Sequence, residues 1–153
     1  MKRYILAVSL IIPGLLFSQR LGLGVIAGSP TGLSFKYLLS QRSAFSAHAG
    51  WSFIGDKGVH ITGDYQYLFP MVIKTAERTS ISDLTPYIAA GGRFRVKETD
   101  EDDTEFHLGL RIGGGAEYSI DRFGIFLELL PVVDLIPETD FDFEGGIGFL
   151  VYF

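Results

Sequence analysis

The chain has no cysteine among its 153 residues. It therefore forms no disulfide, and it cannot carry the lipid anchor that some exported proteins attach to a cysteine behind their signal segment. Basic residues are in the minority, with 13 Lys and Arg against 18 Asp and Glu and a formal net charge of −5 at pH 7. This balance argues against nucleic acid as a partner. No motif in the sequence predicts a cofactor.

Long hydrophobic runs are also missing from most of the chain. After Gln19 no uninterrupted apolar stretch approaches the ~20 residues that a membrane-spanning helix needs. Residues 1–18 join the basic pair Lys2 and Arg3 to an apolar segment, which is the pattern of a secretory signal peptide. An uncleaved anchor helix is the alternative, although Pro13 interrupts the apolar run. We expect a signal peptide over 1–18 and one exported domain over 19–153.

Glycine and aromatic residues are abundant instead, with 19 Gly, 13 Phe and 7 Tyr, which suits strands and tight turns better than helices. Apolar residues alternate with small or polar ones at a period of two, as in strands with one apolar face. Eight segments show this alternation: residues 21–28, 31–39, 44–53, 59–69, 86–96, 106–118, 123–135 and 141–153. Most are long enough for a tilted membrane strand. The sequence predicts an all-β protein, an eight-stranded antiparallel up-and-down transmembrane β-barrel.

Two closed architectures bury one face of eight such strands. A soluble barrel places the apolar face inside, whereas an outer-membrane barrel places it against lipid and keeps a polar lumen. The polar face here consists of small polar residues and isolated charges, which suit a narrow interior. The apolar face carries Trp51 and several Tyr and Phe near strand ends, as interfacial aromatic girdles do. We favour the membrane barrel, and a soluble periplasmic barrel that binds a small apolar ligand is the alternative.

The segments between the predicted strands are mostly turn-like. With both termini in the periplasm, the segments near residues 30, 55, 100 and 138 face outward. The stretch from Pro70 to Asp83 is a long periplasmic connection, which shortens if the fourth strand continues through Met71 and Ile73. Pro131 falls inside a strand, where it lacks a donor, so we expect a bulge or the end of the ladder there.

Several motifs resemble a known family. The stretches "GSPTGLSFKY", "DYQYLF" and "FLELLPVVDLIPET" occur in this order, followed by a glycine-rich strand that ends in an aromatic residue. Together they resemble small Gram-negative outer-membrane β-barrel proteins of unknown function, which are similar to the barrel of outer-membrane protein A. The resemblance implies an outer-membrane location and brings no assigned chemistry.

The last strand also resembles the signal read by the barrel assembly machinery. The residues that carry this resemblance are Glu144, Gly146, Phe149, Val151 and Phe153. The partners implied are that machinery, outer-membrane lipids and lipopolysaccharide, with room for an extracellular partner at the outer loops.

Ten charged residues are expected on the inward face, where unpaired ions are costly and a linked network of ion pairs is favoured. They are Lys36, Asp64, Arg93, Arg95, Arg111, Glu117, Glu128, Asp134, Asp142 and Glu144. We interpret the network as a structural plug. A narrow gated pore is the alternative, although eight strands leave an interior that side chains fill.

Other candidate sites are weaker. His48, His60 and His107 share the inward face, but strand spacing does not bring three or four metal ligands together, and no metal site is predicted. The acidic stretch over residues 97–105 lacks the spacing of a known calcium loop. Ser46, Ser52 and the three histidines share the polar face, but their spacing does not assemble a nucleophile, a base and an orienting residue. We expect a structural or surface-interaction protein, not an enzyme.

Overall fold

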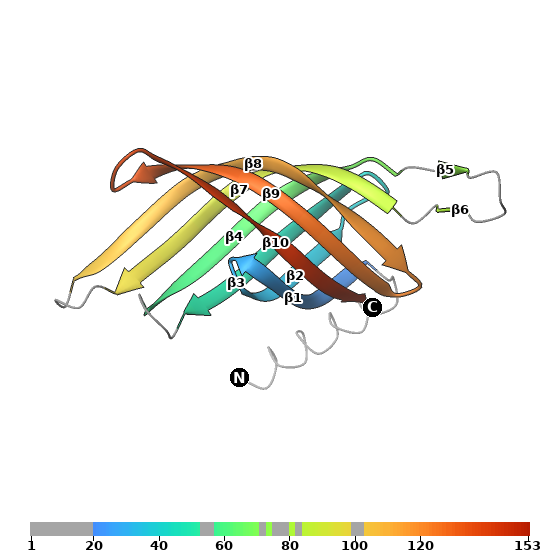
Figure 1. Cartoon of the computed structure of the whole chain (residues 1–153), viewed down its shortest axis with the longest axis horizontal. Helices are drawn as coiled ribbons and strands as arrows, with labels where there is room; N and C mark the ends of the chain where they lie inside the picture. Colours follow the sequence, from blue (N-terminus) through green and yellow to red (C-terminus); the bar gives the residue numbers. More distant parts are fainter. Residues whose placement is uncertain (1–19, 53–56, 71–72, 75–79, 82–83, 99–102) are drawn as a thin grey trace, which may run out of the picture.

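A computed structural model describes residues 20–52, 57–70, 73–74, 80–81, 84–98 and 103–153. Eight strands close into one antiparallel barrel in the order β1-β10-β9-β8-β7-β4-β3-β2 (Figure 1). Their bounds are β1 Leu21–Ser29, β2 Gly32–Leu38, β3 Ser43–Ser52, β4 Lys57–Leu68, β7 Leu84–Glu98, β8 Thr104–Ile120, β9 Phe123–Ile136 and β10 Asp140–Tyr152. The predicted all-β fold and eight-stranded up-and-down barrel are confirmed. The predicted signal peptide lies outside the described residues.

The period-two alternation sorts each strand into an inner and an outer face. In β9, Leu127 and Leu129 are 63% and 59% exposed, whereas Phe126, Glu128 and Leu130, which alternate with them, are buried. Successive side chains of a strand point to opposite faces, so a regular ladder keeps this division along its whole length. The predicted inward and outward faces are those of the structure.

The two ends of the barrel differ. The end formed by the β1–β2 turn, the last residues of β3 and β7, the first residues of β4 and β8 and the β9–β10 connection is called the loop end here. The opposite end carries Arg20 and Phe153 and is called the terminal end. Strands β7 to β10 have 13 to 17 residues, but β1 has 9 and β2 has 7. The wall therefore stands higher on the β7–β10 side of the loop end, as the left of Figure 1 shows.

The bulge expected at Pro131 is elsewhere. The β8–β9 register is the same on both sides of Pro131, and only the pairs of Pro131 and Leu130 with β8 are missing. Proline has no N–H, so the carbonyl of Ile112 opposite it loses one ladder donor while the strand continues. The register shift lies at Leu108/Gly109, nearer the loop end. The prediction of a bulge or a ladder end at Pro131 was wrong. The missing N–H removes two ladder pairs, but the strand gains no extra residue and keeps its register.

The fourth strand does not continue through Met71 and Ile73. It ends at Leu68, and Ile73 belongs to β5 (Ile73–Lys74), which pairs with β6 (Ser80–Ile81) in a separate two-stranded sheet beside the barrel (Figure 1). Met71 lies outside the described residues, as does part of the connection. Within the described part of the chain, no helix is long and apolar enough to cross a membrane.

Candidate functional site

Arg111 is the centre of a buried charge cluster inside the barrel. Its side chain is fully buried and meets carboxylates from three other strands. Nε lies 3.0 Å from Asp64 on β4, Nη1 lies 2.6 Å from Glu144 on β10, and Nη2 lies 3.4 Å from Glu128 on β9. One guanidinium has donors in a planar fork, which lets it contact several carboxylates at once. Arg111 thereby ties β8 to both sides of the ring.

Glu144 meets a second group of basic side chains on the loop-end side of Arg111. Its Oε1 accepts from Arg93 Nη1 at 2.6 Å and from Arg95 Nη2 at 3.3 Å. The Nε2 atom of His60 lies 2.8 Å from the same oxygen. The carboxylate is completely buried, and its Oε2 contacts Arg111. Burial of an ion is costly unless its charge is matched, and here several donors converge on one carboxylate.

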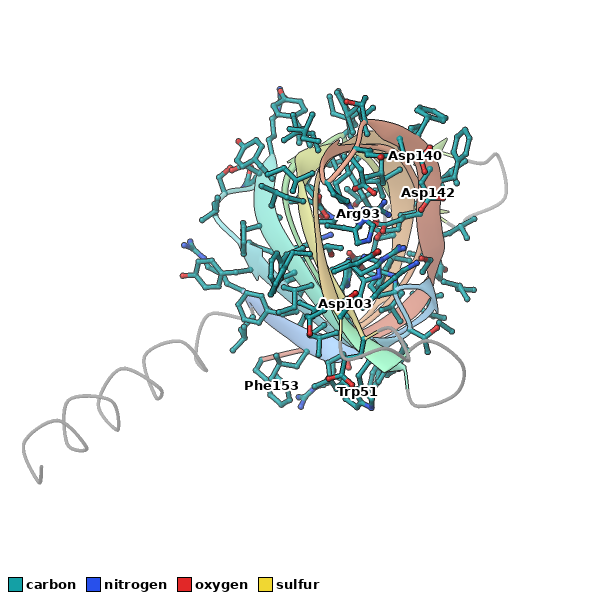
Figure 2. All side chains as sticks on the ribbon, turned by 90° about the vertical axis from the view of Figure 1, so that its left-hand side faces the viewer. Trp51, Arg93, Asp103, Asp140, Asp142 and Phe153 are labelled. Atoms are coloured by element: carbon teal, nitrogen blue, oxygen red, sulfur yellow. The ribbon has the colours of Figure 1, made fainter. Side chains whose placement is uncertain are left out.

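Arg93 connects this cluster to the rim of the loop end. It binds Asp134 with two bonds, Nε to Oδ1 at 2.9 Å and Nη2 to Oδ2 at 2.6 Å, and its Nη1 donates to Asp142 at 3.0 Å. The view into the loop end shows Arg93 inside the ring of strands (Figure 2). The Asp142 side chain is 46% exposed, so the network reaches solvent at this point.

Lys36 and Glu117 form a separate ion pair toward the terminal end. Their Nζ and Oε2 atoms are 2.5 Å apart, and the hydroxyl of Tyr152 donates to the other oxygen of Glu117. Tyr87 joins the two groups, because Lys36 Nζ lies 4.9 Å from the centre of its ring and its hydroxyl donates to Glu128 at 2.9 Å. The structure thus brings the ten predicted residues into two clusters with Tyr87 between them.

Sequence reasoning did not single out Tyr87, nor the apolar residues that fill part of the interior. One apolar cluster consists of Ala44, Leu68, Tyr87, Ala89 and Leu130, and a second of Ile26, Phe126 and Leu150. All of these residues lie at inward-facing alternate positions of their strands. This alternation is the sequence signal that could have identified them. The interior is therefore mixed in character, with most charges toward the loop end and apolar side chains toward the terminal end.

The three histidines lie beside carboxylates. His48 Nε2 is 3.2 Å from Glu128, and His107 Nδ1 is 3.7 Å from Asp134. In the described part of the chain no group of three or more His, Asp and Glu side chains is arranged to hold a metal ion. Of the acidic residues weighed as calcium ligands, Asp103 and Glu105 are exposed, and Asp100, Glu101 and Asp102 lie outside the described residues.

The described residues form a hollow at each end of the barrel and a small space between them. A cavity of about 350 Å³ opens at the loop end, and one of about 270 Å³ opens at the terminal end beside Lys36 and Tyr152. Between them, a space of about 10 Å³ is lined by Ser34, His48 and other interior residues. A space of this size holds at most about one water molecule. Ion pairs and apolar clusters separate the two mouths.

The residues of the predicted assembly signal fall on both faces of β10. Phe149 points outward and is 40% exposed, and Phe153 beyond the strand is 39% exposed. Glu144 points inward into the charge cluster, and a Cβ on Gly146 would overlap the carbonyl oxygen of Ala27 in β1. Val151 is half-buried and pairs with Leu23 of β1. Glu144 and Gly146 therefore also have places in ion pairing and in closure of the barrel.

Comparison with solved structures identifies a barrel of the same kind. The crystal structure of the N-terminal β-barrel domain of Pseudomonas aeruginosa OprF matches with a TM-score of 0.60 and 20% sequence identity, over 87% of this chain and 95% of that domain. No protein-family model matches the chain, and no curated protein matches it significantly. The expected likeness to barrels of the outer-membrane protein A type is confirmed for the fold: this chain is a closed eight-stranded antiparallel barrel similar to the OprF barrel domain.

Proposed function

We propose that this protein is an integral outer-membrane β-barrel whose interior is closed by ion pairs and whose role is structural or surface-interactive. The observation that carries the proposal is the inverted distribution of side chains. Large apolar residues such as Ile112, Leu127 and Leu110 are 68%, 63% and 60% exposed on the wall, whereas Arg111 and Glu144 are buried inside it. Exposed apolar area on this scale marks a surface that contacts lipid or another protein.

The alternative, a soluble periplasmic barrel with an apolar ligand site, fits the side chains less well. Such a barrel needs an apolar interior with space for the ligand. The interior here contains buried Lys36, Arg93 and Arg111 with their carboxylates, and its central space is about 10 Å³. The outer wall would expose leucine and isoleucine to water from several neighbouring strands, which favours aggregation.

Fractionation with heat-modifiable gel electrophoresis tests the proposal. We expect the protein in the outer-membrane fraction, soluble only with detergent, and migrating faster in unboiled than in boiled samples because the closed barrel resists denaturation by detergent. A water-soluble product with the same mobility before and after boiling would support the soluble alternative and overturn the proposal.

We further propose that the interior is a plug and not a conducting pore. Support comes from the complete burial of Arg111 and Glu144 and from the separation of the two mouths. In planar bilayers we expect no sustained, well-defined conductance steps. Such steps, reproduced across independent preparations, would favour the narrow gated pore.

We propose lipids, lipopolysaccharide and the barrel assembly machinery as partners, with the loop end outside the cell. Phe149 and Phe153 support the assembly role, since both expose their rings on the wall beside β1. Substituting Phe153 by alanine should slow insertion more than it weakens the folded barrel. Equal insertion rates for the variant and the parent protein would exclude this role for Phe153.

A further inference from the structure

The loop end holds a pocket that lies between the barrel interior and its outer wall. This rim pocket has a volume of about 350 Å³ and is bordered by the β1–β2 turn and by β3, β4 and β7. Its basic side chains are His60, Arg95 and Lys97, and its large apolar side chains are Trp51, Val59 and Val96. The wall is low here because β1 and β2 are short, so the pocket is reached both from the mouth and from the side.

Glycines and the β1–β2 turn form its base. A Cβ on Gly50 would lie 2.7 Å from the carbonyl oxygen of Thr31 and 2.8 Å from Cβ of Pro30, so the turn packs directly on the strand. Pro30 is buried by this contact. The base is therefore closely packed, and the hydroxyl of Thr31 is bonded to the backbone of Gly28, which leaves the three basic side chains as the charged recognition elements.

Arg95 and Lys97 have donors that the described residues do not use. Both are half-buried and share the inward face of β7. In the described part of the chain, Arg95 donates one hydrogen bond, from Nη2 to Glu144, although a guanidinium has five N–H groups. No described carboxylate lies within 4.0 Å of Lys97 Nζ, and the pocket side chains include no described carboxylate. These donors suit the oxygens of an anionic group such as a phosphate.

The apolar side of the pocket faces the lipid surface. Trp51 and Val59 are 51% and 46% exposed and belong to the outward face of β3 and β4, where they pair with each other across the ladder. Seen from the loop end, Trp51 lies outside the ring of strands and Arg93 inside it (Figure 2). Trp and Tyr side chains of membrane proteins concentrate at the level of the lipid headgroups. A molecule in the rim pocket therefore meets cations at one end and an apolar wall at the other.

We propose that the rim pocket binds a membrane lipid with an anionic phosphate headgroup, the phosphate contacting Arg95 and Lys97 and the acyl chains lying along Trp51 and Val59. The inference rests on the proposed membrane location. A free inorganic anion is disfavoured, because it would contact only the basic side of the pocket and leave Trp51 and Val59 without a partner. The apolar contacts of the lipid supply the binding energy that a free phosphate lacks.

Trp51 is the single tryptophan of the chain, so its fluorescence reports whether a ligand occupies the rim pocket. The protein purified in dodecyl maltoside is titrated with dihexanoyl phosphatidic acid, dihexanoyl phosphatidylcholine and inorganic phosphate, while Trp51 fluorescence is recorded. We expect a saturable change with phosphatidic acid, and weaker or no saturation with the other two. Equal titration by phosphatidylcholine would overturn the role of the cations, and saturation by inorganic phosphate in the same range would overturn the lipid assignment.

Two variants and a matched control test whether phosphatidic acid binds at Arg95 and Lys97. Arg95→Gln combined with Lys97→Gln should raise the dissociation constant for phosphatidic acid about tenfold, the effect of losing charge-assisted hydrogen bonds. Lys97→Gln alone, which removes none of the described ion pairs, should raise it by a smaller factor. Arg42→Gln, an exposed cation at the terminal end, should leave it unchanged. Unchanged binding in both pocket variants would refute the site.

Gel mobility of the same samples separates this inference from the proposed function. A protein that is heat-modifiable and binds no phosphatidic acid refutes the lipid site alone. A protein that is not heat-modifiable refutes the membrane barrel itself.

Discussion

At the scale of single residues, the loop-end cluster is organised around Arg111 and Glu144. They contact one another, and between them they also contact Asp64, Glu128, Arg93 and Arg95. Arg111 contacts Asp64, Glu128 and Glu144, three carboxylates that would otherwise face one another in a closed space. Each charge is tolerated because its neighbours are of opposite sign. Removing one partner exposes the others to uncompensated burial.

Substituting Arg111 by methionine should therefore lower the free energy of unfolding by about 3–5 kcal/mol, the usual effect of breaking a buried ion cluster. Arg95→Met is the comparison, since the Arg95 side chain is 21% exposed and donates one described hydrogen bond, so its loss should cost distinctly less. Urea unfolding in phospholipid vesicles, followed by gel mobility, measures both. If the two variants were equally stable, Arg111 would not be the centre of the cluster.

Single residues also show the limit of sequence reasoning about the site. The inward position of Arg93 and Asp142 follows from strand parity, but their contact joins β7 to β10, which are not neighbours in the sheet. Which residues meet across the interior depends on strand tilt and stagger, and alternation within a strand contains no information on either. Tyr87 was missed for the same reason, because its two partners belong to β2 and β9.

At the scale of elements, closure depends on the first and last strands of the barrel. Gly24 of β1 pairs with Leu150 of β10, and a Cβ on Gly24 would overlap the carbonyl oxygen of Phe149. The two strands approach too closely there for any side chain on the inner face of β1. Glycine is needed at this position because of the close approach of two backbones.

Gly24→Ala should therefore push β1 away from β10 and reduce the yield of closed barrel on refolding, seen as loss of the fast-migrating band in unboiled gels. The matched control is Gly63→Ala in β4, where the new Cβ would lie 3.5 Å from the ring of Phe45, an ordinary contact. We expect Gly63→Ala to refold like the parent protein. Normal closure by Gly24→Ala would show that the ladder adjusts without loss.

Element boundaries were predicted well where alternation is strong and poorly at strand ends. The predicted strand over residues 106–118 is β8 without its ends, since Thr104–Ile120 also includes residues with no clear alternation. The ladder continues there because paired backbone groups, and not side chains, hold the two strands together. At Pro131 the sequence predicted a break where the strand continues, because the loss of one donor does not end a strand that is paired on both sides.

At the scale of the whole molecule, the outer wall provides a test of the proposed membrane location. Ile112, near the middle of β8, is 68% exposed, and Phe106, near the loop end of the same strand, is 55% exposed. In water these two positions would tolerate a charge equally. In a bilayer they would not, because the cost of a charge depends on depth.

Ile112→Arg should lower the unfolding free energy in phospholipid vesicles by about 2–4 kcal/mol, and Phe106→Arg by about 0–1 kcal/mol, as for lipid-facing charges at the midplane and near the interface. Urea titrations of both variants in the same vesicles give the difference. Equal effects at the two positions would contradict a lipid-facing wall around β8.

The unequal strand lengths have a consequence for the order in which the barrel comes apart. β2 has 7 residues and β8 has 17, so the seams around β1 and β2 contain far fewer backbone hydrogen bonds than those around β8. Local opening is cheapest where the fewest bonds must break together. In hydrogen–deuterium exchange, amides of β1 and β2 should therefore exchange first, while those of β7, β8 and β9 stay protected as one curved sheet until the whole barrel unfolds.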